Sequence, residues 1–253
     1  MLRTVLATRY VTPLREGGSL PAIVEADDLG LYVVKFRGAG QGPLALVAEI
    51  VAGEIARELG LPVPELVLVE LDPALGRNEP DAEIRELLQG SAGLNVGMDF
   101  LPGSAMYDAG AGDNPGPQLA SAMVWFDAFV LNVDRTVRNP NLLWWHRSLY
   151  LIDHGAALYF HHNWPTAQES ASSPFRAVRD HVALASASAI PEAGERMRSL
   201  LSAELFERVL CMVPAEWFAA EGGRAAYVSW LSERLRSSAA FVEEAVRARS
   251  ALL

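Results

Sequence analysis

The polar segment at residues 132–141, NVDRTVRNPN, holds residue types that could move a proton and bind a cation. Asp134 and Asn139 stand five residues apart in an expected loop, and Pro140 limits helix formation directly after them. A loop carboxylate can accept a proton from an attacking hydroxyl, and an amide oxygen can bind a hard cation such as Mg²⁺. A turn whose Asn and Asp side chains satisfy their own backbone is the ordinary alternative, and the segment alone favours neither.

A second carboxylate, Asp153, lies in the sequence LIDHG, which closes a predicted β-hairpin. If the hairpin turn centres on Arg147, strand pairing places Asp153 roughly opposite Asn141 and near Asn139. Their oxygens could then share one metal ion, with either asparagine as a ligand. Gly155 would permit a sharp turn away, although an Asp-x-Gly sequence taken singly predicts only an ordinary turn.

Lys35 is a charged residue at the end of an apolar strand predicted at residues 31–36. Burying an ammonium group is costly unless an anion compensates it, so this lysine could reach into a cleft toward phosphate oxygens. The ordinary alternative is that Lys35 extends its ammonium group from the strand end into water and binds nothing. On the next predicted helix Glu49 lies beside the apolar stripe, and it is better placed than Glu54 to pair with Lys35.

A glycine-containing turn, Gly17, Gly18 and Ser19, follows the first predicted strand. Its backbone N–H groups could bind a phosphate. A simple hairpin connection is the commoner explanation for two glycines without a longer motif.

Hydrophobic periodicity predicts two parts of different character. The first contains strands and one main helix, with a short polar helix near residues 81–88: strands at residues 5–11, 22–26, 31–36, 66–71 and 94–101, and the main helix at residues 44–59. Glycine and proline fill residues 108–117, which indicates a boundary. The rest is mainly helical, with a hairpin between helices: helices at residues 118–131 and 224–249, and hairpin strands at residues 142–145 and 149–152. We therefore predict an α+β fold with a small β-rich lobe at residues 1–101 and a larger helical lobe at residues 102–253.

Composition limits the possible partners and location. The chain has 253 residues, 51% of them hydrophobic, and a formal net charge of −10, which disfavours bulk nucleic-acid binding. A local basic patch is still possible from three arginines that could attract an acidic substrate, although solvated surface charge is the commoner outcome: Arg135, Arg138 and Arg147. The single Cys211 excludes an intramolecular disulfide. Residues 122–131 are too short to span a bilayer and contain Asp127, and the start lacks a secretory signal, so we expect a cytoplasmic protein.

These features occur in the order typical of kinase-type phosphotransferases. In this the chain resembles the HipA-like kinases and, more distantly, the phosphoinositide kinases. Residues 132–139 are similar to the HipA catalytic loop, which opens with Asn-x-Asp and ends with Asn. Residues 151–155 resemble the Ile-Asp-Phe-Gly motif of the lipid kinases, with His154 in place of Phe. Residues 48–64 are much like the Asn-Glu helix and Leu-Gly-Leu-x-Val-Pro exit of HipA proteins.

The resemblance implies a bilobal protein-kinase-like fold and a role for each of several residues. Lys35 would hold the nucleotide phosphates, and Glu49 would orient Lys35. Asp134 would be the catalytic base, while Asn139 and Asp153 would bind Mg²⁺.

Two further segments take roles from the same resemblance. The strand through Met98, Asp99, Phe100 and Leu101 would be the hinge whose backbone reads adenine. The turn with Gly17 and Gly18 would contact the nucleotide, and Ser19 sits where HipA-type kinases can autophosphorylate.

The resemblance thus implies an ATP- and Mg²⁺-dependent phosphotransferase, with a protein Ser/Thr hydroxyl favoured as the acceptor. Two alternatives stay open: a small-molecule or lipid kinase on the same fold, and a nucleotide-binding pseudokinase that acts as a partner module. The presence of Asp134 ranks the pseudokinase last.

Overall fold

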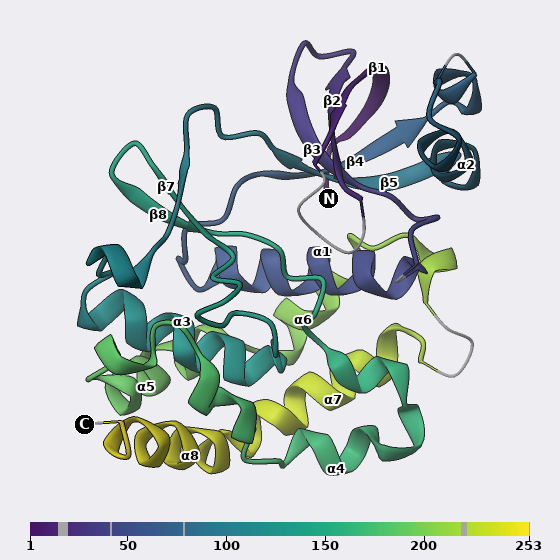
Figure 1. The fold of residues 1–253 in the computed structure, drawn as a ribbon. Helices are drawn as coiled ribbons and strands as arrows, with labels where there is room; N and C mark the ends of the chain where they lie inside the picture. The colour runs from purple at the N-terminus through teal and green to yellow at the C-terminus, as the bar shows by residue number, and fades with distance from the viewer. Residues whose placement is uncertain (15–19, 41, 78, 219–221, 253) are drawn as a thin grey trace.

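The structure is a computed structural model that describes residues 1–14, 20–40, 42–77, 79–218 and 222–252 (Figure 1). The predicted turn Gly17, Gly18 and Ser19 lies outside the described residues. Five strands form a closed barrel in the order β1-β2-β3-β5-β4: β1 (Thr4–Pro13), β2 (Ala22–Ala26), β3 (Leu31–Lys35), β4 (Leu66–Leu71) and β5 (Gly93–Asp99). The barrel closes because β1 pairs parallel with β4, while the other neighbours pair antiparallel.

The alternation of side chains along β3 decides what faces the barrel interior. Tyr32 and Val34 are buried among the barrel side chains, whereas Val33 and Lys35 point to the opposite face and line a cavity. The strand therefore has one face toward the barrel core and one toward the cavity. Lys35 ends β3 on the face that leaves the barrel core.

Helix α1 (Gly42–Glu58) lies between the barrel and the helical part of the molecule (Figure 1). Residues 45–56 of this helix are all buried, because the barrel covers one side and α6 (Ala203–Leu210) packs on another. The helix is followed by Gly60, whose φ of 76° suits a residue without a side chain. The second helix of this region, α2 (Ala82–Gly90), begins at Asp81, whose carboxylate accepts hydrogen bonds from two amides of the first turn.

The helical part is built around α3 (Pro117–Val130), which is buried over most of its length. Trp125 of α3 stacks on Phe129 and contacts Phe241 edge-on. Three helices pack against α3: α5 (Ile190–Leu200), α7 (Arg224–Arg236) and α8 (Ser238–Ser250). The short helix α4 (Ala167–Ala171) packs against α7. No helix in the described part of the chain is long and apolar enough to cross a membrane.

The single long helix predicted at residues 224–249 is wrong. The chain forms α7 and α8 instead, separated at Ser237. The Ser237 hydroxyl donates a hydrogen bond to Glu233 Oε1, and two consecutive serines favour helix ends over helix interiors. The break lets Trp230 of α7 and Phe241 of α8 both enter the core around α3.

A small second sheet contains β6 (Ala105–Met106), β7 (Leu142–Trp145) and β8 (Ser148–Leu151). The predicted hairpin is present, but its turn does not centre on Arg147. His146 and Arg147 form a two-residue turn with φ values of 47° and 65°, which is the backbone that matches the twist of paired strands. The register therefore pairs Leu142 with Leu151, and the Ile152 amide donates to the Asn141 carbonyl. Asp153 is displaced by one residue from the predicted position opposite Asn141.

Candidate active site

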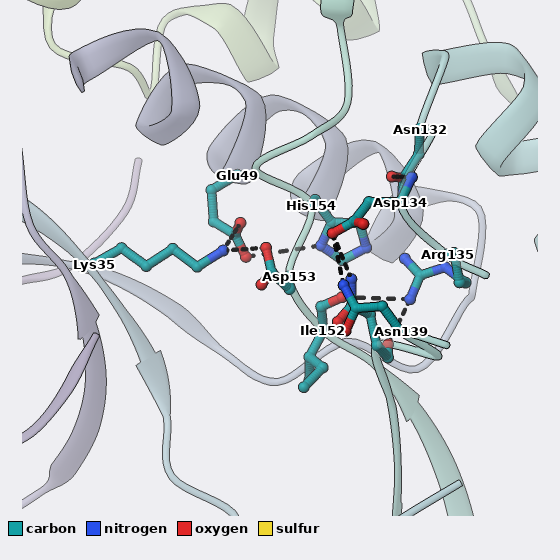
Figure 2. Close-up of polar contacts among 10 residues, drawn as sticks. Lys35, Glu49, Asn132, Asp134, Arg135, Asn139, Ile152, Asp153 and His154 are labelled. Carbon is teal, nitrogen blue, oxygen red and sulfur yellow. Dashed lines mark hydrogen bonds and ion pairs between the residues drawn. The ribbon is translucent and has the colours of Figure 1, made fainter. Parts of the chain in front are cut away.

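Lys35, Glu49 and Asp153 meet at the junction of the barrel, α1 and the end of the hairpin (Figure 2). The Lys35 ammonium nitrogen lies 2.6 Å from Glu49 Oε2 and 2.5 Å from Asp153 Oδ1. Glu54, the weaker candidate, pairs with Arg57 on its own helix. The predicted pairing of Lys35 with Glu49 is thus present, and it includes Asp153 as a third member.

Burial and charge act in opposite directions on this cluster. Burial alone would lower the pKa of Lys35, but the negative charges of Glu49 and Asp153 outweigh it and raise the pKa above its ordinary value. Burial alone would raise the pKa of Glu49, but the adjacent Lys35 charge lowers it to about 2. Lys35 and Glu49 are therefore both ionised at neutral pH and form an ion pair.

Gly155 lies beside this cluster. A Cβ at position 155 would lie 3.4 Å from Lys35 Nζ and 3.6 Å from both Asp153 Oδ1 and Glu49 Oε2. The expected turn is present: Gly155 and Ala156 are its central residues, and the Ala157 amide donates to the His154 carbonyl at 2.9 Å. Asp153, two residues earlier, has a φ of 54°. A methyl group at position 155 would therefore make ordinary contacts with the charged atoms, and the left-handed backbone falls on an Asp, which tolerates it.

Asp134 lies at the centre of a second polar cluster, in the loop after α3 (Figure 2). Its Oδ2 accepts a hydrogen bond of 2.7 Å from the side-chain Nδ2 of Asn139 and a longer one of 3.4 Å from the side-chain Nδ2 of Asn141. Burial, together with the negative charge of Asp153, raises the Asp134 pKa above its ordinary value. A carboxylate with a raised pKa is a better proton acceptor for a hydroxyl than an ordinary surface aspartate.

A buried ion pair holds this loop in place. Arg135 Nε donates to Asp127 Oδ2 at 2.7 Å, and both side chains are fully buried. Arg135 Nη1 also donates to the backbone carbonyls of Asn141 and Ile152, which flank the hairpin. Arg135 therefore cannot belong to the possible positive surface patch of Arg135, Arg138 and Arg147, because its guanidinium is buried and paired with Asp127.

Asp127 joins two more residues to the same junction. Its Oδ1 accepts a hydrogen bond from the Asn132 side chain at 2.9 Å, and its Oδ2 lies 2.9 Å from His181 Nε2. The Ala183 amide donates to His181 Nδ1, so Nε2 carries the proton that is donated to Asp127. Burial alone would raise the Asp127 pKa, but Arg135 and His181 lower it below its ordinary value. Neither Asp127 nor His181 was predicted as a site residue. The sequence feature that could have indicated Asp127 is a carboxylate inside an apolar helix.

A cavity of about 1160 Å³ runs between the barrel and the loop. Residues from both sides line it: Val33, Lys35, Met98, Asp134, Asn139, Asn141, Ile152 and Asp153. Leu14 and Pro21 also line it and are joined by a hydrogen bond from the Leu14 amide to the Pro21 carbonyl. Both clusters thus open into one space.

The predicted hinge only partly reaches this cavity. The Met98 side chain lines it, whereas Asp99, Phe100 and Leu101 are not among the lining residues. The Asp99 amide donates to the Glu65 carbonyl and the Phe100 amide to the Leu31 carbonyl. These two amides are already used within the fold, so they would not serve as free donors to a base.

His154 occupies a buried position behind the first cluster. Its ring contacts Phe126 edge-on at 5.8 Å, and its Nδ1 lies 3.9 Å from Glu49 Oε1. The histidine that replaces phenylalanine in this motif therefore packs like an aromatic residue against α3.

The donor atoms around the cavity suit a hard cation. Asp153 and Asp134 supply carboxylate oxygens, and Asn139 and Asn141 carry amide oxygens, which are the ligand types that Mg²⁺ prefers. The Asp153 side chain is 45% exposed, so its carboxylate is accessible from the cavity. Within the described residues no group of three or more His, Cys, Asp or Glu side chains forms a metal site. This set fits a cation that shares its coordination with substrate phosphates.

The sequence of this chain matches a known protein family. A family model described as HipA-like kinase matches residues 8–243. The chain belongs to the HipA-like kinase family. This confirms the predicted family and identifies the protein as a kinase-type phosphotransferase. A search of curated proteins gave no match.

Two solved structures are similar to this chain. The crystal structure of CtkA, a proinflammatory kinase of Helicobacter pylori, is similar with a TM-score of 0.60 and 15% sequence identity over 100% of both chains. A Golgi casein kinase gives a TM-score of 0.49 and 12% identity over 96% of this chain and 72% of its own. The likeness to CtkA supports a mixed α+β kinase-like fold, as predicted.

Proposed function

We propose that this HipA-like kinase binds ATP with Mg²⁺ and transfers the γ-phosphate to a Ser or Thr hydroxyl of a protein. The observation that carries the proposal is the convergence of Lys35, Glu49 and Asp153 with Asp134 and its asparagines on one cavity. Phosphoryl transfer depends mainly on positioning and charge neutralisation, which these groups are able to supply. The protein acceptor rests on the resemblance to HipA-like kinases.

In this proposal residues 1–101 and 102–253 act as the two lobes, and ATP lies between them. Val33, Met98 and Ile152 provide apolar side chains for the adenine end of the cavity. Lys35 holds phosphate oxygens, while Glu49 keeps the ammonium group oriented. The segment Met98 to Leu101 would contribute through groups other than the Asp99 and Phe100 amides.

Asp134 accepts the proton of the acceptor hydroxyl, and its raised pKa suits that role. Asn139 and Asn141 hold the Asp134 carboxylate in place through their amide nitrogens. Asp153 and the oxygen of Asn139 would hold Mg²⁺, which supplies charge neutralisation at the phosphates when bound. Arg135 fixes the backbone on both sides of this arrangement through the Asn141 and Ile152 carbonyls.

The test is a transfer assay with γ-labelled ATP and Mg²⁺, offered separately to a cell-protein extract, phosphoinositide vesicles and a panel of hydroxylated metabolites. We expect label on serine or threonine of a protein with the wild type and none with Asp134→Asn. Label on a lipid or metabolite alone would overturn the protein acceptor but keep the kinase. Magnesium-dependent ATP binding with no transfer to any acceptor, including the chain itself, would favour the pseudokinase.

A further inference from the structure

Arg138 is a cationic residue of the cavity with no role assigned above. It is exposed, lines the same cavity as Asp134 and Asp153, and directly precedes Asn139. The backbone around it is tightly held, because Thr136 and Asn139 exchange hydrogen bonds of 3.1 and 3.2 Å. The position of Arg138 is therefore fixed by the same turn that presents Asp134 and Asn139.

The charges lining the cavity single out this residue. Among its described lining residues the cations are Lys35 and Arg138. Lys35 is bonded to two carboxylates, whereas Arg138 has no carboxylate partner in the described part of the chain. A triphosphate entering the cavity brings several negative charges beside Asp134 and Asp153. Arg138 is thus the lining cation whose charge is not already matched by the protein.

The position of Arg138 relative to Lys35 indicates which phosphate group of ATP Arg138 would contact. Lys35 ends strand β3 on the barrel side of the site, while Arg138 shares its loop with the proposed base Asp134. The acceptor hydroxyl must lie at Asp134, so the phosphoryl group in transfer lies at the loop side. A guanidinium there can donate two parallel hydrogen bonds to phosphate oxygens.

We propose that Arg138 is a catalytic residue that binds the γ-phosphoryl group of ATP, an inference that rests on the proposed function. In the transfer the acceptor oxygen forms a bond to the γ-phosphorus as the bond from that phosphorus to the β–γ bridging oxygen breaks. The acceptor proton goes to Asp134, and ADP leaves with the bond electrons. Arg138 neutralises charge on the non-bridging γ-oxygens throughout this step.

The proposal predicts that Arg138 distinguishes ATP from ADP. The experiment compares wild type, Arg138→Ala and Arg138→Lys with Arg196→Ala, which removes the same charge from an exposed position on α5. Dissociation constants are measured with Mg²⁺ for ADP and for a non-hydrolysable ATP analogue, and transfer is followed in a single turnover. Thermal unfolding shows whether each variant is folded.

For Arg138→Ala we expect affinity for the ATP analogue to fall about 10- to 100-fold, with ADP affinity nearly unchanged. The single-turnover rate should fall by about 100-fold, and Arg138→Lys should recover part of both losses. Equal losses for both nucleotides, a rise only in acceptor KM, or behaviour like Arg196→Ala would overturn the role of Arg138. A wild type that binds neither nucleotide would instead overturn the proposed function itself.

Discussion

The ammonium group of Lys35 lies 2.5 Å from the carboxylate of Asp153, although 118 positions separate the two residues in the sequence. The contact joins the last residue of β3 to the second residue after β8. Asp153 pairs with Lys35 in this structure, and in the proposed function it binds a cation. If Asp153 binds the cation instead of Lys35, Glu49 would still balance the positive charge of Lys35, because its carboxylate accepts a hydrogen bond from the same ammonium group.

Glu49→Gln is expected to change how stability depends on pH. Burial alone would raise the Glu49 pKa, but Lys35 lowers it to about 2 from an ordinary value of 4.5. A lowered carboxyl pKa stabilises the folded state above the unfolded-state value, and that stability is lost as pH falls from about 4.5 toward 2. The contribution at neutral pH is about 3 kcal/mol in the free energy of unfolding.

The measurement is the free energy of unfolding in urea between neutral pH and the acid limit of folding. Wild type should lose stability across this window, and Glu49→Gln should start lower and show a flatter curve. Glu58→Gln, at an exposed position on the same helix, is the control. Parallel pH curves for wild type and Glu49→Gln would show that Lys35 does not hold the Glu49 carboxylate ionised.

Asp127→Asn is expected to destabilise the fold strongly. Asp127 and Arg135 are fully buried and bonded at 2.7 Å, so the substitution leaves a buried guanidinium without its counter-charge. Loss of one partner of a buried pair costs about 3–5 kcal/mol. Urea denaturation gives the value, with the exposed Asp180→Asn as the control. A loss below about 1 kcal/mol, as for an exposed pair, would contradict the positioning role of this junction.

Asp134→Asn should separate chemistry from binding. Asn keeps the shape of the side chain but cannot accept the acceptor proton, so the single-turnover transfer rate should fall by about 10²- to 10⁴-fold. Affinity for a non-hydrolysable ATP analogue should change little, because Lys35 and Asp153 remain. Transfer at the wild-type rate would refute Asp134 as the base.

Gly155→Ala should affect function more than folding. The added methyl group would lie 3.4 Å from Lys35 Nζ, an ordinary contact that the fold tolerates. It would nevertheless occupy the space into which Lys35 and Asp153 must move to reach phosphate and cation. We expect kcat/KM to fall by about 10- to 100-fold with a small change in Tm. Unchanged kcat/KM would mean that the glycine is needed for another reason.

Local pattern was enough to predict much of the fold. Alternation along residues 31–36 puts Lys35 on the face opposite Tyr32 and Val34, and helical spacing favours Glu49 slightly over Glu54 as its partner, a pairing that the structure shows. Both are short-range properties, because they depend on the period of one strand and one helix. The order of motifs added the family, which the match over residues 8–243 confirms.

The errors lie where one residue decides the geometry or where the partner is distant. The hairpin register was displaced by one position because a two-residue turn at His146 replaces a turn centred on Arg147. The junction of Asp127 with His181 spans 54 positions, and no local period indicates it. A lone carboxylate in the apolar helix at residues 122–131 does require a buried partner, but the sequence alone does not name it.

The central claim is that one cavity holds a cation and a triphosphate between Lys35 and Asp153. Calorimetric titration of a non-hydrolysable ATP analogue, with and without Mg²⁺, into wild type and Asp153→Asn tests it most directly. We predict binding by the wild type that weakens at least about tenfold when Mg²⁺ is removed, and a similar loss in Asp153→Asn. No binding by the wild type, or equal affinity with and without Mg²⁺ in both proteins, would contradict it.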